Sequence, residues 1–228
     1  MVHTEVKAAF LLEALKFAKS DECEKIYFSE NEVFTTGKYY LKFAKMECEK
    51  HTKNCEFTIE SKHADSILKT FEGCDTVSIE KTNNYAIFRS EGKELRILKT
   101  WGELPNIWYL LPSNSEQVVV HSFYIYSKYL KTLLEKAYEA NPKGGIIHFN
   151  LDETVAISVN GLSNSITEGE NKKSVRLRAT QLKDLLHSID SDRFILNITD
   201  EKITRNVHII PCGYENFTLL LTPILYEF

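Results

Sequence analysis

Residue types that catalyse reactions are present in this sequence, but they do not form a known catalytic pattern. There is no glycine-rich phosphate loop, no G-x-S-x-G nucleophile motif and no H-E-x-x-H zinc motif. The seven histidines are scattered, and His148 and His208 fall within strand patterns, where a structural role is the more common one. Because no set of residues with defined catalytic roles can be assembled, we expect that the protein is not an enzyme.

Four residues, Cys48, His51, Cys55 and Cys74, are of types that bind zinc. Their spacing matches none of the paired-ligand patterns of structural zinc sites, and Cys74 is isolated. We therefore expect small, buried or half-exposed thiols, with no metal and no cofactor. The odd number of cysteines, five, and the absence of a signal-like or membrane-spanning apolar run favour a reduced, intracellular protein with no membrane partner.

Basic side chains follow the most regular pattern, because they lie opposite the apolar stripes of four amphipathic helices. These outward residues are Lys16, Lys19, Lys62, Lys69, Lys128, Lys131, Lys136, Lys183 and His187. Fewer acids share these faces: Glu13, Asp65, Glu135, Glu139 and Asp184. The net charge of −4 argues against a wholly basic nucleic-acid binder but is compatible with a basic face. Taken singly, each lysine is ordinary solvated surface.

The helices that carry these lysines are predicted from apolar residues at i, i+3, i+4 and i+7. Their expected ranges are Lys7–Ala18, Lys62–Phe71, Ser127–Ala140 and Ala179–Ile189. The expected strands are Val2–Val6 (an edge strand), Lys25–Ser29, Val33–Thr36, Tyr39–Met46, a strand marked by Phe57 and Ile59, Thr76–Lys81, Tyr85–Ser90, Glu94–Lys99, Val118–Tyr124, Ile146–Asn150, Thr154–Val159, Ser163–Glu168, Ser174–Arg178, Arg193–Thr199, Val207–Pro211 and Phe217–Thr222. A polar loop is expected at Glu49–Asn54.

This order of elements is a repeat. Each half reads strand, helix, three strands, strand, helix, three strands, and the halves are offset by roughly 115–120 residues. Between them, residues 101–117 contain two prolines, one glycine and an apolar cluster without regular period. The sequence therefore predicts an α+β protein with a domain at 1–100, a connector at 101–117 and a second domain at 118–228, each with two helices packed on antiparallel sheets.

Four helices, each followed by a group of three strands and arranged in two domains, resemble the DNA sliding clamps, the processivity rings of replicative polymerases. The stretch "VRLRATQLKDLLHSIDSDRFILNITD" is similar to the last helix and following strand of the bacterial beta clamp, and "NFTLLLTPILYEF" is similar to the ending of that family. The resemblance implies a two-domain DNA-clamp fold that encircles duplex DNA without regard to sequence and tethers the replicative polymerase. A bacterial-like ending on a chain of two-domain length suggests a phage or mobile-element clamp. It also implies a separate clamp loader.

Bacterial clamps have three such domains and close as dimers, whereas two-domain clamps close as trimers, so the resemblance implies a homotrimer. Edge strands would join the copies, and the Thr76–Lys81 and Ser163–Glu168 regions are the candidates.

The resemblance further implies a pocket for the polymerase and other proteins with clamp-binding motifs. Its residues would be Trp108, Leu110, Leu111, Pro112, Pro223, Ile224 and Leu225. The alternative for this apolar connector is simple burial across the domain junction. The alternative for the whole protein is a monomeric clamp-fold module that binds DNA or another protein without encircling DNA.

Overall fold

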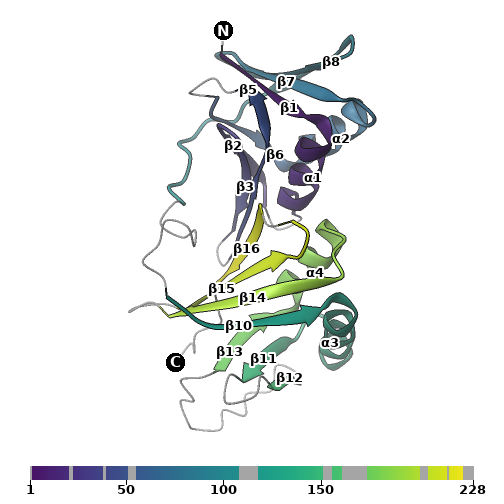
Figure 1. The fold of residues 1–228 in the computed structure, drawn as a ribbon, viewed down its shortest axis with the longest axis vertical. Helices are drawn as coiled ribbons and strands as arrows, with labels where there is room; N and C mark the ends of the chain where they lie inside the picture. Colours follow the sequence, from purple (N-terminus) through teal and green to yellow (C-terminus); the bar gives the residue numbers. More distant parts are fainter. Residues whose placement is uncertain are drawn as a thin grey trace. The chain divides into compact units, whose positions relative to one another are not determined.

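The structure is a computed structural model, and it describes residues 2–20, 23–37, 40–50, 55–107, 118–150, 156–160, 174–200, 205–214 and 216–222. The chain divides into two compact units (Figure 1). The first comprises residues 1–114 and 214–218, and the second comprises residues 115–213 and 219–228. None of the helices in the described ranges is long and apolar enough to cross a membrane.

The helices and strands of the first unit follow the predicted order, with one additional strand, β5, and a short 3-10 helix, η1. They are β1 (Val2–Lys7), α1 (Ala8–Ala18), β2 (Lys25–Ser29), β3 (Glu32–Thr36), β4 (Tyr40–Lys45), β5 (Cys48–Lys50), β6 (Phe57–Glu60), η1 (Ser61–His63), α2 (Ala64–Phe71), β7 (Thr76–Lys81), β8 (Tyr85–Ser90) and β9 (Lys93–Leu98). Gly73, with φ of 77°, follows α2 in the left-handed conformation that commonly ends helices.

The second unit has the same alternation of helices and strands, with three described strands between its helices where the first unit has five. Its elements are β10 (Val118–Tyr126), α3 (Ser127–Ala140), β11 (Ile146–Asn150), β12 (Ala156–Asn160), β13 (Ser174–Arg178), α4 (Ala179–Ser188), β14 (Arg193–Asp200) and β15 (Arg205–Pro211), followed by β16 (Phe217–Leu221), which runs from residues of the first unit into the second. The predicted α+β class with helices packed on antiparallel sheets is confirmed.

Each unit has antiparallel sheets. In the first unit, one sheet has the order β5-β1-β7-β8-β9, and β4-β3-β2-β6 are neighbours in another. In the second unit, the orders are β12-β11-β13 and β10-β14-β15-β16. Neighbours in chain order pair locally, but β1 and β7 pair across residues 8–75, and β10 and β14 pair across residues 127–192.

The helix starts show the duplication at the level of single hydrogen bonds. Each helix, or for α2 the 3-10 helix η1 that leads into it, begins with a backbone N–H that donates to a carbonyl just before the strand that follows the other helix of its unit. These bonds run from Ala8 to Asp75 (2.9 Å), Ser61 to Glu24 (2.7 Å), Ser127 to Asp192 (2.9 Å) and Ala179 to Gly145 (3.0 Å). Because helix starts leave backbone donors without partners inside the helix, this reciprocal arrangement ties each helix pair to its sheets.

Three expectations about strands are wrong. The segment expected as an edge strand at Val2–Val6 is internal, because β1 pairs with both β5 and β7. The loop expected at Glu49–Asn54 begins with strand β5, whose short polar sequence has no strand pattern of its own. The Thr76–Lys81 region is not a free edge, because β7 pairs with β1 and β8. The other expected edge, Ser163–Glu168, lies outside the described residues.

The first unit has an aromatic core beneath its helices. The rings of Phe28 and Phe57 stack at 4.5 Å, and Phe88 meets them edge-on at 6.0 and 6.2 Å. Phe71 of α2 lies 6.4 Å from Phe88, so the helix is anchored to the same cluster. Such rings are the largest hydrophobic contributors to a core of this size.

The carboxyl group of Glu32 makes the stability of the first unit depend on pH. Burial, opposed in part by Lys45 and assisted by Glu30, raises the pKa of Glu32 from 4.5 to about 7. The folded state binds the proton of the Glu32 carboxyl group more tightly than the unfolded state. The contribution of protonated Glu32 to the unfolding free energy is therefore complete below pH 4.5 and is lost as the pH rises to 7.

Replacing this group by an uncharged one, Glu32→Gln, is expected to stabilise the first unit above pH 7. The gain is roughly 1 kcal/mol, because Glu32 is only partly buried and solvent screens it. Thermal unfolding above pH 7 and near pH 4.5 should show the gain only at the higher pH. An equal gain at both values, or an equal gain in the exposed control Glu24→Gln, would contradict this origin.

Candidate nucleic-acid interface

In the first unit, α1 and α2 lie side by side (Figure 1). The predicted inner face of α1 is confirmed, since Leu11, Ala14, Leu15 and Ala18 are all fully buried. On α2, Ala64, Ile67 and Phe71 are fully buried, and Leu68 is half-buried. The remaining faces of the two helices form one surface, which is mainly polar on α2 but on α1 also contains the half-buried Phe10 and Leu12.

The basic side chains of this first-unit surface differ in how free they are. Lys16, Lys62 and Lys69 are exposed. Lys19 is half-buried and joins the two helices, since its Nζ lies 2.8 Å from a carboxylate oxygen of Asp65. Lys62 pairs with Glu60. Lys16 and Lys69 make no ion pair with a described residue, so they are the groups of this surface most available to an external anion.

In the second unit, α3 and α4 also lie side by side (Figure 1). Leu130, Leu133, Leu134 and Ala137 of α3 are buried as predicted. On the outward side, the exposed basic residues are Lys128, Lys131, Lys136, Lys183 and His187. The Lys183 ammonium lies 4.9 Å from the centre of the Tyr138 ring, a cation–π contact that connects α4 to α3.

Acidic side chains interrupt both surfaces. Glu135 and Glu139 of α3 and Asp65 of α2 are exposed, whereas Glu13 and Asp184 are half-buried. Of the three lysines on α3, none makes an ion pair within the described part of the chain. Each helix pair thus presents lysine ammonium groups that make no ion pair with a described residue, which is the chemistry that attracts phosphates irrespective of base sequence.

Two other predicted groups of residues give less information. All seven residues assigned to the partner-peptide pocket, Trp108, Leu110, Leu111, Pro112, Pro223, Ile224 and Leu225, lie outside the described residues. Of the candidate zinc ligands, Cys55 and Cys74 are buried, and the side chains of Cys48 and His51 are not among those described. Within the described residues, no three His, Cys, Asp or Glu side chains form a group that would hold a metal ion.

Both strand histidines lie in the sheets of the second unit. His208 on β15 is fully buried, and burial lowers its pKa from 6.5 to about 4. Burial and the nearby Arg176 also lower the pKa of His148 on β11. Both shifts favour the neutral imidazole of a residue packed within a sheet.

Sequence patterns did not reveal a second group of lysines on the strands of the first unit. Lys81 ends β7 and Lys99 follows β9, and both line one pocket with the exposed Trp101. Their proximity results from pairing of β7 and β9 with β8, so no local period in the sequence signals it.

The fold defined by these two units is that of DNA sliding clamps. Comparison with models of protein families finds no match, and no curated protein sequence matches. Solved structures do match along nearly the whole chain, which confirms the resemblance at the level of the fold.

Among the matching structures are beta subunits of bacterial DNA polymerases. That of DNA polymerase III from Thermotoga maritima has a TM-score of 0.72 at 12% identity, over 100% of this chain and 66% of its own. Those from Streptococcus pyogenes (TM-score 0.73, 17% identity, 97% and 65%) and Caulobacter crescentus (0.74, 13%, 98% and 66%) are similar. The present chain thus spans slightly less than two thirds of their length.

Proposed function

We propose that this protein is a sliding clamp that encircles duplex DNA and tethers a DNA polymerase for processive synthesis. The observation that carries the proposal is the presence, on a clamp fold, of two helix pairs, each with exposed lysines that make no ion pair with a described residue. In this proposal the protein performs no chemistry itself. Its action is topological, since a closed ring cannot leave DNA sideways while weak phosphate contacts let it move along the duplex.

The charge on the helix surfaces suits this mode of binding. Duplex DNA carries one negative charge for about every 1.7 Å of its axis, so scattered lysines find phosphates at any position and in any sequence. The interspersed carboxylates Glu135 and Glu139 limit the strength of each contact. A surface of this kind attracts DNA without fixing a register, which is what sliding requires.

A ring of six such units requires three copies of the two units described here, so the proposed assembly is a homotrimer. Free strand edges would join the copies. In the first unit, β9 is a six-residue edge, whereas the opposite edge, β5, has three residues. We therefore assign β9 as one side of the junction in place of Thr76–Lys81, with Ser163–Glu168 retained as the expected other side.

The tethering function needs partner proteins. Polymerase and other proteins with clamp-binding motifs would dock on the connector and C-terminal residues named above, from Trp108 to Pro112 and from Pro223 to Leu225. A separate ATP-driven loader would open the ring, since the sequence contains no phosphate loop of its own.

The first test of this proposal is the mass in solution, measured by light scattering at several concentrations. We expect three times the chain mass of 26.3 kDa. In a separate binding assay, we expect the protein to be retained on circular duplex DNA but not on linear duplex DNA. A particle that stays monomeric at high concentration would instead favour a clamp-fold module that binds DNA or protein with one face. Salt-dependent binding to duplex DNA would then distinguish a module that binds DNA from one that binds only protein.

The junction can be tested with one backbone substitution, Arg96→Pro. The Lys99 N–H donates to the Asn84 carbonyl (2.9 Å), so the alternation of an antiparallel ladder turns the Arg96 N–H away from β8. Proline at this place removes an edge donor but leaves the β8–β9 ladder intact. We expect the trimer to dissociate at concentrations where Arg96→Ala, which keeps the N–H, remains trimeric. Equal masses for the two variants would exclude β9 from the junction.

A further inference from the structure

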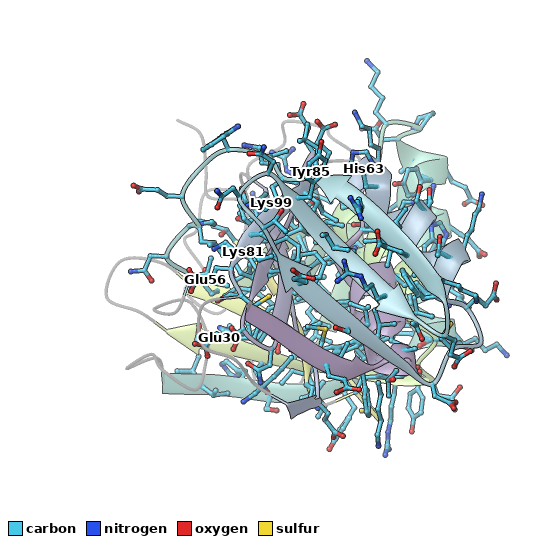
Figure 2. All side chains as sticks on the ribbon, turned by 90° about the horizontal axis from the view of Figure 1, so that it is seen from above. Glu30, Glu56, His63, Lys81, Tyr85 and Lys99 are labelled. Carbon is cyan, nitrogen blue, oxygen red and sulfur yellow. The ribbon has the colours of Figure 1, made fainter. Side chains whose placement is uncertain are left out.

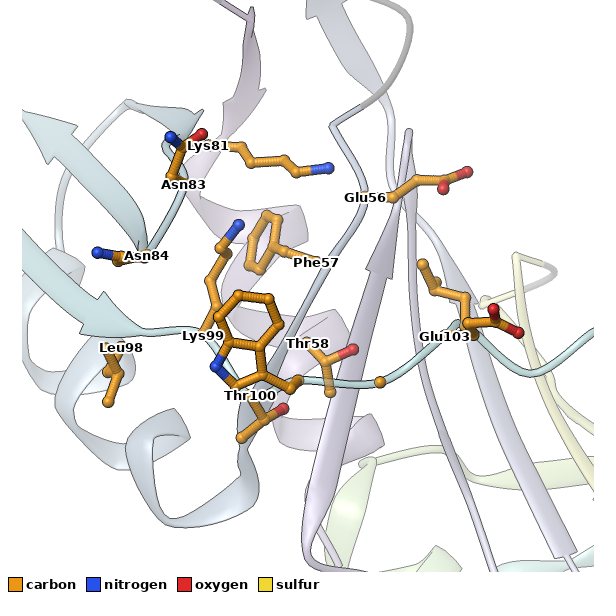
Figure 3. A pocket seen from close by; sticks show the side chains of 13 residues that line it. Glu56, Phe57, Thr58, Lys81, Asn83, Asn84, Leu98, Lys99, Thr100 and Glu103 are labelled. Carbon is orange, nitrogen blue, oxygen red and sulfur yellow. The ribbon is translucent and has the colours of Figure 1, made fainter.

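A pocket of about 450 Å³ in the first unit is made by residues outside the helix surfaces (Figure 3). Two backbone hydrogen bonds position the segment that closes it. The Lys99 N–H donates to the Asn84 carbonyl at 2.9 Å, and the Thr100 N–H donates to the Thr58 carbonyl of β6 at 2.8 Å. This size is within the range of pockets that bind ligands or short peptide segments.

One side of the pocket is cationic. Lys81 and Lys99 lie near each other in two views (Figures 2 and 3), and neither forms an ion pair with any residue that the structure describes. Burial and the like charge of Lys81 lower the pKa of Lys99. The amides of Asn83 and Asn84 lie on the same side (Figure 3). This side therefore has hydrogen-bond donors and unneutralised positive charge for a carboxylate.

Apolar side chains also line the pocket. Trp101 is 88% exposed and Leu98 is 60% exposed, although both are large hydrophobic side chains. Phe57 forms the floor, where it is buried and stacked on Phe28. Exposed tryptophan beside a firm apolar floor is typical of the anchor points at which few residues supply most of the binding energy.

The opposite side is acidic. Figure 3 shows Glu56 and Glu103 on the far side of Phe57 from Asn83 and Asn84, and both glutamates are exposed. Two lysines and two glutamates line the pocket, so their charges cancel. A polyanion such as a nucleic-acid strand would meet the two carboxylates, whereas a segment with opposite charges at its two ends would meet complementary groups throughout.

We infer that this pocket binds a short peptide segment of a partner protein with an acidic residue at one end, a leucine or aromatic anchor in the middle and a basic residue at the other end. The acidic residue binds Lys81 and Lys99, the anchor packs on Trp101 and Phe57, and the basic residue faces Glu56 and Glu103. This site goes beyond the proposed function, because it uses none of the DNA-facing or connector-pocket residues assigned above and requires no ring.

The probes are two fluorescein-labelled hexapeptides, Asp-Asp-Leu-Phe-Lys-Lys and its reverse, because the structure leaves the direction of the segment open. Controls are Asp-Asp-Ala-Ala-Lys-Lys, which lacks the anchor, and labelled hexathymidylate. Fluorescence anisotropy with the full chain should show that one of the two charged hexapeptides binds more tightly than both controls. Binding of neither peptide at a Kd below about 1 mM, or tighter binding of hexathymidylate, would overturn the inference.

Variants locate the binding. Trp101→Ala should weaken the peptide by about tenfold, the loss expected for an anchor residue. The double variant Lys81→Glu/Lys99→Glu should no longer bind this peptide. It should instead bind Lys-Lys-Leu-Phe-Lys-Lys, a gain of binding that misfolding cannot produce. The control Lys7→Glu/Lys143→Glu changes two exposed lysines elsewhere and should alter neither affinity. Unchanged binding in Trp101→Ala, or no change of preference in the double variant, would place the peptide elsewhere.

Discussion

Reversing the charge of two lysines on α3, Lys128→Glu/Lys131→Glu, is expected to weaken binding to duplex DNA on the order of 100-fold at ~50 mM salt. Both side chains are exposed and make no ion pair with a described residue. Each phosphate contact contributes through the release of condensed counterions, and each new carboxylate adds repulsion. The two sites lie in the first half of α3, where acidic residues suit the helix dipole, so the fold should tolerate them.

The measurement is a salt titration of affinity for linear duplex. The slope of log K against log salt should decrease by about 0.9 for each phosphate that the variant no longer neutralises. The control Lys7→Glu/Lys143→Glu makes the same change in net charge at exposed residues outside the four helices. If the control loses as much affinity as the α3 variant, net charge rather than the helix surface governs binding.

The first unit provides an independent check of the same idea. Lys16→Glu/Lys69→Glu changes the two lysines of the α1–α2 surface that make no ion pair with a described residue. If both units contact one duplex, the loss of binding free energy in the combined variant should be close to the sum of the separate losses, since distant sites act additively. Full affinity in the Lys16→Glu/Lys69→Glu variant would mean that α1 and α2 do not face DNA.

The second large effect is expected from acid. His208 is fully buried on β15, opposite Asn197 of β14 and Leu220 of β16. Its folded pKa of about 4 is lower than its ordinary value of 6.5, because burial disfavours the charged imidazole. The contribution of neutral His208 to the unfolding free energy is therefore complete above pH 6.5 and is lost as the pH falls to 4. The second unit should lose about 3 kcal/mol of unfolding free energy over this range.

Hydrogen exchange of the β14 and β15 amides at several pH values between 4 and 7 would measure this loss. The uncharged substitution His208→Gln should be less stable than the original at neutral pH, because glutamine does not match the imidazole shape, but its stability should vary much less with pH. His63→Gln, in the first unit, should leave the pH dependence of the second unit unchanged. A second unit equally stable at pH 4 and 7 would contradict a neutral, buried His208.

The helices and their faces were predictable from the sequence because their signals are local. Ser127–Ala140 was predicted with the observed bounds, and the outward lysines of α3 are exposed as expected. A helix buries residues three and four positions apart, so its inner and outer faces can be identified within one or two turns. The order of helices and strands then led to the clamp fold, which the structural matches confirm.

Strand partners were predicted less well because pairing joins distant segments. Nothing within Val2–Val6 or Thr76–Lys81 reveals that each has a neighbour on both sides. The short β5 pairs with β1 across more than 40 residues of chain. The alternation of apolar residues in a strand indicates which of its faces is buried, but not whether a second strand pairs with its edge.

The sequence by itself therefore determined the four helices, the exposed faces that carry the lysines, and the repeated order that leads to the clamp fold. Tertiary structure alone decided which lysines have an ion-pair partner among the described residues: Lys19, just after α1, is bound by Asp65, 46 residues away, whereas Lys16 in α1 makes no ion pair with a described residue. It also brought Lys81, Lys99 and Trp101 into one pocket. The physical reason is that helix faces follow from contacts within a few residues, whereas charge pairing and pocket formation depend on strands and helices that meet only after folding.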